Sequence, residues 1–126
     1  MTKQKILMVD DDLDLVRAVA RKLRSRGFEV TVAQDGLTAV SEARKQRPDL
    51  VLLDLGLPAG DGFTTLGRIR GLLPLSDVPV VVFSARDDRS SRERALRAGA
   101  NEFVPKSSVG EIVPIIERIF AEQASE

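Results

Sequence analysis

The sequence predicts an α/β fold: a doubly wound, five-stranded parallel sheet in the strand order 2-1-3-4-5, with helices on both faces. Two observations support this prediction. Segments with strand character alternate five times with segments in which apolar residues recur at helical spacing. Three of the strand segments are apolar at nearly every position, as is typical of parallel strands that are covered on both sides.

The expected strands differ in how completely they are buried. The central strands are expected at residues 6–9, 50–53 and 78–83. Residues 28–32 alternate between polar and apolar positions, and residues 102–104 are short and followed by Pro105. These two segments suit the edges of the sheet, where one side is less buried and a missing N–H is tolerated. Right-handed crossovers then give the order 2-1-3-4-5.

Four of the five expected helices carry apolar residues at helical spacing, and the fourth helix in the chain has only an adjacent pair. In chain order they are Val16, Val19, Ala20 and Leu23; Ala39, Val40 and Ala43; Phe63, Leu66 and Ile69; Ala95 and Leu96; and Ile112, Ile116, Ile119 and Phe120. Gly27, Pro48 and Gly71 mark the ends of the first three helices. The fourth, within residues 89–98, has few apolar residues and many arginines, which predicts that it is the weakest.

Two signals disagree about the start of the last helix. Ser108 and Glu111 have the spacing of a capping box, which would start the helix near Ser108. That start would place Pro114 deep inside the helix, where its ring and its missing N–H are unfavourable.

Composition restricts the functions that the chain can have. Its 126 residues fit one domain, which we expect to span residues 1–126. The 19 basic side chains balance the 19 acidic ones, so no net charge attracts nucleic acid or an anionic membrane. Histidine and cysteine are absent, which excludes Ser-His-Asp chemistry, thiol catalysis and imidazole or thiolate metal sites. With no stretch of transmembrane length and no signal-peptide pattern, we expect a cytoplasmic location.

Polar residues follow four of the five expected strands. In strand order they are Asp10, Asp11, Asp12, Asp54, Ser84 and Lys106. The carboxyl ends of parallel strands meet at one rim, and ligands bind there where the strand order reverses. Several carboxylates around one point repel one another and form an all-oxygen site, which suits Mg²⁺. Lys106 would add a positive charge, and Ser84 a hydroxyl able to bond a phosphoryl oxygen.

Each of these residues also has an ordinary structural explanation. Asp12 is best explained as the N-cap of the first helix. Asp54 could be a loop residue, Ser84 a cap of the fourth helix and Lys106 a solvated surface lysine. Their joint occurrence at the ends of four strands favours the functional interpretation. We interpret the arginines of the fourth helical segment first as a solvated face and second as a partner surface; they are Arg86, Arg89, Arg92, Arg94 and Arg97.

Over nearly its whole length, the chain resembles the receiver domain of bacterial two-component response regulators. Four motifs carry the resemblance: K-I-L-M-V-D-D-D, D-L-G-L-P-A-G-D-G, V-V-V-F-S-A-R-D-D and A-G-A-N-E-F-V-P-K-S. The resemblance implies the three-layer sandwich called flavodoxin-like or CheY-like. It also implies a signalling switch that catalyses its own phosphorylation on an aspartate and its own slow dephosphorylation.

The resemblance assigns roles to the residues of the expected rim. It makes Asp54 the phosphoacceptor and makes Asp10 and Asp11 the acidic pair. Asp11, Asp54 and the backbone carbonyl of Gly56 would bind Mg²⁺ directly, and Asp10 would bind it largely through water.

The resemblance also assigns roles in switching. Lys106 would bind the phosphoryl group, Ser84 would be the switch hydroxyl and Phe103 the switch aromatic. Gly56 and Arg86 lie two residues beyond the phosphoacceptor and the switch hydroxyl. In that family, these two positions flank the path of the water that ends the phosphorylated state, so they would tune its lifetime.

The implied partners follow from the missing histidine. The phosphoryl group must come from a phosphohistidine on a sensor histidine kinase or a histidine phosphotransfer protein, or from a small acyl phosphate. The surface of the fourth helix, fifth strand and last helix would then contact an output domain, an effector protein or a second copy of the chain. The P-K-S-S sequence at residues 105–108 resembles receivers attached to helix-turn-helix output domains. We expect this domain itself to bind neither nucleic acid nor membrane.

Three other functions fit parts of the sequence. An Mg²⁺-dependent phosphohydrolase with an aspartyl nucleophile generally needs a second aspartate at the position of Gly56. A flavodoxin-like flavin or nucleotide binder needs a phosphate cradle, and the three aspartates at residues 10–12 would repel a phosphate. A phosphorylation-independent interaction module leaves the acidic pair, Asp54 and Lys106 without an explanation.

Overall fold

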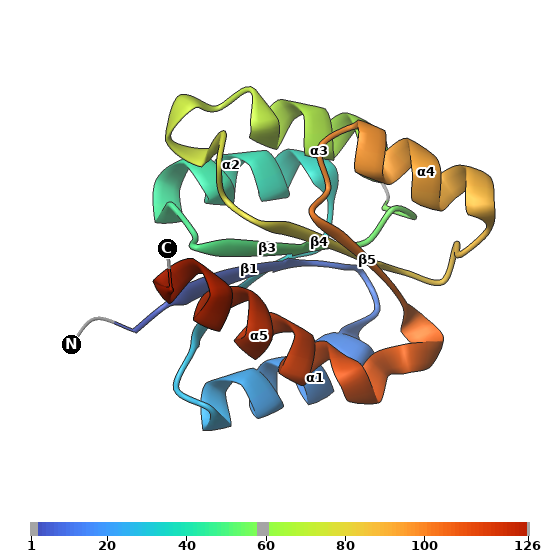
Figure 1. Ribbon diagram of the computed structural model, residues 1–126. Helices are drawn as coiled ribbons and strands as arrows, with labels where there is room; N and C mark the ends of the chain where they lie inside the picture. Colours follow the sequence, from blue (N-terminus) through green and yellow to red (C-terminus); the bar gives the residue numbers. More distant parts are fainter. Residues whose placement is uncertain (1–2, 58–60, 126) are drawn as a thin grey trace.

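The strands form the predicted parallel sheet. The computed structural model describes residues 3–57 and 61–125, and in it five strands lie in the order β2-β1-β3-β4-β5 (Figure 1). The strands are β1 (Lys5–Val9), β2 (Glu29–Ala33), β3 (Leu50–Leu53), β4 (Val80–Ser84) and β5 (Glu102–Pro105). Every neighbouring pair is parallel, so all five carboxyl ends share one rim. The predicted fold class and strand order are confirmed.

Five α-helices cover the two faces of the sheet. They are α1 (Leu13–Ser25), α2 (Gly36–Gln46), α3 (Gly62–Arg70), α4 (Arg89–Arg97) and α5 (Ile112–Ala124), with short 3₁₀ helices η1 (Leu73–Leu75) and η2 (Lys106–Glu111). Helices α1 and α5 lie on one face, and α2, α3 and α4 lie on the other (Figure 1). None of the helices in the described ranges is both long and apolar enough to cross a bilayer.

The central strands contribute side chains to two separate apolar cores. Leu7 and Leu53 join the core under α2, α3 and α4. Met8 and Leu52, the next positions along the same strands, join the core under α1 and α5. Successive strand residues point to opposite faces, so a run that is apolar throughout is what a doubly covered strand requires.

The first four α-helices each begin after an aspartate whose side chain accepts a hydrogen bond from a backbone N–H three residues on. These N-caps are Asp12, Asp35, Asp61 and Asp88. The prediction for Asp12 is therefore confirmed, whereas Ser84 does not cap α4. Hydrogen bonds from the cap partners lower the pKa of Asp35, Asp61 and Asp88 below the usual 3.8. The stabilisation from these charged caps is therefore present above pH 3.8 and is lost as the pH falls through the lowered values.

Of the two signals for the start of the last helix, the capping-box spacing is the misleading one. Ser108 lies inside η2, with φ −99° and ψ 31°, and α5 begins only at Ile112. The residue before it, Glu111, makes no side-chain capping bond. This later start places Pro114 in the first turn of α5, where an N–H has no partner within the helix and proline is tolerated.

Helix α4 packs against its neighbours through few buried residues. Its buried residues are Ser91 and Ala95, while Leu96, an expected apolar anchor, is 50% exposed. Two of its arginines lie instead over aromatic rings. The guanidinium carbon of Arg94 is 3.9 Å from the centroid of Phe63, and that of Arg92 is 4.9 Å from the centroid of Phe103. The arginine face is thus mostly solvated, as predicted, but part of it packs.

Candidate functional site

Two aspartates are positioned by the ends of the central strands. The backbone N–H of Asp10 donates to the carbonyl of Ala33 at 3.0 Å, and that of Asp54 donates to the carbonyl of Val9 at 2.9 Å. These bonds continue the sheet one residue beyond β1 and β3, so both carboxyl groups lie at the same rim. Asp10 is 1% exposed and Asp54 is 6% exposed. Carboxylate oxygens of Asp10, Asp11 and Asp54 lie within 4.8 Å of one another.

Lys106 brings a positive charge to this acidic cluster. Its Nζ is 2.9 Å from Oδ2 of Asp10 and 3.4 Å from Oδ2 of Asp54. Asp10 also accepts a hydrogen bond at 3.0 Å from the backbone N–H of Asp12, the residue that caps α1. The cluster therefore joins the ends of β1, β3 and β5, as the sequence predicts. The peptide bonds on both sides of Lys106 are trans.

The electrostatics of the cluster are dominated by burial and by an excess of carboxylates. Burial raises the pKa of Asp10, and the charge of Asp54 adds to that effect, although the hydrogen bond from Lys106 opposes it. Burial alone would lower the pKa of Lys106, but its hydrogen bond to Asp10 and the charge of Asp54 outweigh burial and raise it. Lys106 therefore stays charged at neutral pH. It leaves part of the negative charge of three carboxylates uncompensated, which suits a divalent cation.

Ser84 and Phe103 lie on the same face of the sheet. Ser84 is the last residue of β4 and is 1% exposed, and its Oγ accepts the backbone N–H of Arg86 at 3.1 Å. In the register of β4 and β5, Val82 is opposite Phe103 and Ser84 is opposite Pro105. Side chains two residues apart share a face, so Ser84 is a diagonal neighbour of Phe103 under α4.

Two glycines shape the chain after Asp54. Gly56 is exposed, and a Cβ atom there would lie 3.9 Å from Oδ2 of Asp54, so any side chain at this position would border the carboxylate. Gly62 has no such room, because a Cβ atom would lie 2.6 Å from the carbonyl oxygen of Asp54. Its N–H donates to the carbonyl of Leu55 at 3.0 Å. Residues 58–60, which belong to the D-L-G-L-P-A-G-D-G motif, lie outside the described residues.

The sequence did not predict the contacts that Gly62 and Arg92 make near this rim. The pair Asp61-Gly62 ahead of Phe63 could have indicated Gly62, since a glycine directly after an N-cap is a poor helix former and needs another reason. No periodic signal indicates Arg92. Arg86, by contrast, is exposed, and its predicted place near the reacting group stays a prediction.

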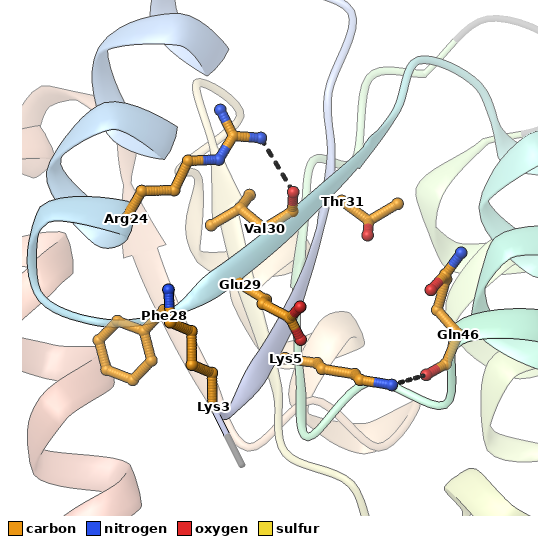
Figure 2. A pocket seen from close by; sticks show the side chains of 8 residues that line it. All are labelled: Lys3, Lys5, Arg24, Phe28, Glu29, Val30, Thr31 and Gln46. Atoms are coloured by element: carbon orange, nitrogen blue, oxygen red, sulfur yellow. Dashed lines mark hydrogen bonds between the residues drawn. The ribbon is translucent and has the colours of Figure 1, made fainter. Parts of the chain in front are cut away.

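A separate hollow lies at the opposite end of the sheet. It has a volume of about 420 Å³ and is lined by Lys3, Lys5, Arg24, Phe28, Glu29, Val30, Thr31 and Gln46 (Figure 2). Arg24 donates to the carbonyl of Val30 at 2.9 Å, and Lys5 donates to the carbonyl of Gln46 at 3.4 Å. Because this hollow lies at the amino ends of β1 and β2, it takes no part in the chemistry of the carboxyl rim.

Comparisons with known proteins agree with the geometry of the rim. The family model for the response regulator receiver domain matches residues 6–117. The transcriptional regulatory protein PrrA of Mycobacterium tuberculosis is 36% identical over 126 residues, which cover 99% of this chain and 53% of PrrA. The transcriptional regulatory protein KdpE of the same species is 43% identical over 101 residues, which cover 80% of this chain and 43% of KdpE. The chain thus spans about half the length of these curated relatives.

One similar solved structure contains a metal ion. It is the receiver domain of the sensor histidine kinase PA1611 from Pseudomonas aeruginosa, crystallised with a magnesium ion coordinated in the active site cleft. Its sequence is 34% identical, its TM-score is 0.83, and the match covers 93% of this chain and 97% of that one.

Proposed function

The chain belongs to the response regulator receiver domains of two-component systems, whose general function is that of a phosphorylation switch, and from this premise we propose that Asp54 is its phosphoacceptor. The observation that carries the proposal is the position of Lys106. Its ammonium group lies between Asp10 and Asp54, with the Asp11 carboxylate in the same cluster. The residues come from three strands, and no capping or packing role accounts for all of them.

The acidic cluster fits Mg²⁺. Its donors are carboxylate oxygens, the ligands that this hard cation prefers, and they are close enough to share one ion. Asp11, Asp54 and the carbonyl of Gly56 would hold the ion directly, with Asp10 acting largely through water. When bound, Mg²⁺ supplies neutralisation of the negative charge on the transferring phosphoryl group.

The proposed reaction is transfer of a phosphoryl group from a phosphohistidine to Asp54. A carboxylate oxygen of Asp54 forms the new bond to phosphorus as the bond from phosphorus to the imidazole nitrogen breaks, which gives an acyl phosphate. Lys106 donates to a phosphoryl oxygen and stabilises the loose transition state. The sequence has no histidine, so the phosphohistidine would be on a sensor histidine kinase or a histidine phosphotransfer protein. Water later attacks the phosphorus as the bond from phosphorus to the Asp54 oxygen breaks, which releases inorganic phosphate and restores the carboxylate.

Phosphorylation would add negative charge and acceptor oxygens at Asp54, and these would act on side chains on the face of the sheet under α4. Ser84 would turn its hydroxyl toward a phosphoryl oxygen, and Phe103, its diagonal neighbour, would pack into the vacated space. The surface of α4, β5 and α5 would then change and be recognised by an output domain, an effector or a second copy. We propose that residues 1–126 form one receiver domain of a cytoplasmic regulator.

Magnesium should raise the free energy of unfolding, because it binds a cluster whose carboxylates repel one another. A ligand at about 100 times its Kd stabilises by about 2.7 kcal/mol. Thermal melts with and without Mg²⁺ measure this. Asp11→Asn should stabilise the metal-free chain and weaken the effect of the metal, whereas Asp77→Asn, at the far end of the sheet, should leave that effect unchanged. Melts that Mg²⁺ does not move would contradict the assignment.

The Ser84→Ala variant should still be phosphorylated, because the hydroxyl is not the nucleophile. It should lose the changes in chemical shift or hydrogen exchange that phosphorylation causes within residues 88–120 of the parent. Ser90→Ala, an exposed serine on α4, is the matched control and should retain those changes. Equal changes in the Ser84→Ala variant and the parent would remove Ser84 from the switch.

A further inference from the structure

The guanidinium group of Arg92 touches two parts of the proposed switch. Its carbon lies 4.9 Å from the centroid of the Phe103 ring, which is half-buried at the outer edge of the sheet. Its Nε donates at 3.2 Å to the backbone carbonyl of Asp87. Asp87 lies in the loop between Ser84, at the end of β4, and the start of α4. The Arg92 side chain therefore connects the Phe103 ring to the loop that follows the Ser84 hydroxyl.

This contact adds to the attachment of α4. The buried residues of the helix, Ser91 and Ala95, are small and supply little apolar area. A half-buried arginine over an aromatic ring adds both the packing of its aliphatic stem and a cation–π attraction. The position of α4 and the position of the Phe103 ring are therefore linked through Arg92.

We propose that Arg92 is a positioning residue that holds Phe103 in its half-exposed place and so favours the resting state of the switch. The inference rests on the proposed function, because it takes Phe103 to move inward on phosphorylation. An inward move would carry the ring away from the guanidinium and lose their attraction. A shift of the Ser84–Asp87 loop would move the carbonyl that anchors Arg92, so the hydroxyl and the ring would be released together.

The expected size of the effect follows from the contact. A cation–π pair near the surface changes an equilibrium by about two- to fivefold. Removing the cation should therefore raise the population of inward Phe103 by about that factor in the resting chain. The apparent affinity for a phosphoryl analogue should rise by the same factor. A ligand that binds a minor state has an apparent affinity proportional to the population of that state.

Fluorine NMR can observe the ring directly. The chain has five phenylalanines and no tyrosine or tryptophan, so labelling with 4-fluorophenylalanine gives five signals, and Phe103→Leu identifies one of them. Arg92→Met keeps most of the stem and removes the charge, and Arg92→Lys keeps a cation. Arg94→Met is the matched control, because it removes a similar contact from the same helix but over Phe63. Each variant is titrated with beryllofluoride in the presence of Mg²⁺.

The proposal predicts that Arg92→Met moves the resting Phe103 signal toward its position in the beryllofluoride-bound parent and tightens binding about two- to fivefold. Arg92→Lys, which keeps a cation but not the Nε–H, should lie closer to the parent than Arg92→Met does, and Arg94→Met should change neither quantity. The proposal is overturned if Arg92→Met leaves the Phe103 signal in place, weakens binding, or acts no differently from Arg94→Met. If the parent itself ignores beryllofluoride, the proposed function fails, and an unmoved Phe103 signal in the resting Arg92→Met chain would still reject the role of Arg92.

Discussion

The Asp54→Asn variant should gain no phosphoryl group under conditions in which the parent chain is fully modified by a small acyl phosphate and Mg²⁺. An amide has nearly the shape of the carboxylate, so the variant should keep the fold and the hydrogen bond from its backbone to Val9. It lacks the anionic oxygen that attacks phosphorus, and this loss has no substitute in the mechanism. Intact mass measured over time gives the extent of modification.

Asp10→Asn is the control that separates the nucleophile from its surroundings. Asp10 is as buried as Asp54 and is closer to Lys106, at 2.9 Å against 3.4 Å. Its replacement removes a neighbouring charge but leaves Asp54 in place, so the variant should still be modified, although more slowly. Stoichiometric modification of Asp54→Asn, together with none of Asp10→Asn, would show that the acceptor is Asp10.

The double variant Gly56→Asn with Arg86→Glu should lose its phosphoryl group about tenfold faster than the parent, which corresponds to about 1.4 kcal/mol of barrier. A Cβ atom at residue 56 lies 3.9 Å from Oδ2 of Asp54, so an amide there can reach and orient the attacking water. Arg86 can only donate hydrogen bonds and cannot accept a proton from that water. Glutamate supplies the missing acceptor.

The rate is measured as decay of the phosphorylated form after excess donor is removed. Gly67→Asn with Arg97→Glu is the matched control, since it makes the same exchanges at exposed positions on α3 and α4, with open space at residue 67. This control should decay at the parent's rate. Decay of the Gly56/Arg86 variant that is equal to or slower than the parent's would show that these positions do not control access of water.

The strand order could be predicted because strands that are buried on both faces are apolar at nearly every position. Val51 and Leu52 point to different cores, and both must be apolar. The same logic placed Asp10 and Asp54 together, since parallel strands that pair must share a rim. Lys106 could be added because it follows the fifth strand, whose carboxyl end lies at the same rim. The strand order therefore predicts that these residues lie together.

The parts that were missed depend on geometry that periodicity does not specify. Ser108 and Glu111 have the spacing of a capping box, but the chain after Lys106 forms a 3₁₀ helix, which delays α5 to Ile112. Leu96 was expected to anchor α4 and is half-exposed. With only Ala95 and Ser91 buried, small differences in the rotation of the helix decide which neighbours face the sheet.

The contact between Arg92 and Phe103 also depends on geometry that periodicity does not specify. Nothing in the spacing of arginines along α4 distinguishes Arg92 from Arg89, which instead pairs with Glu93 at 2.9 Å. The difference arises from β5, whose register sets the Phe103 ring beneath one particular turn of the helix. Such a pairing is visible only once both elements are placed.

The rim formed by β1, β3 and β5 should direct a phosphoryl group to Asp54. The most direct test is to incubate the parent chain with Mg²⁺ and a small acyl phosphate and to locate the added mass by peptide mass spectrometry. We expect one phosphoryl group per chain, carried by the peptide that contains Asp54 and absent when Mg²⁺ is withheld. A phosphoryl group on any other peptide, or no modification while Mg²⁺ is present, would contradict it.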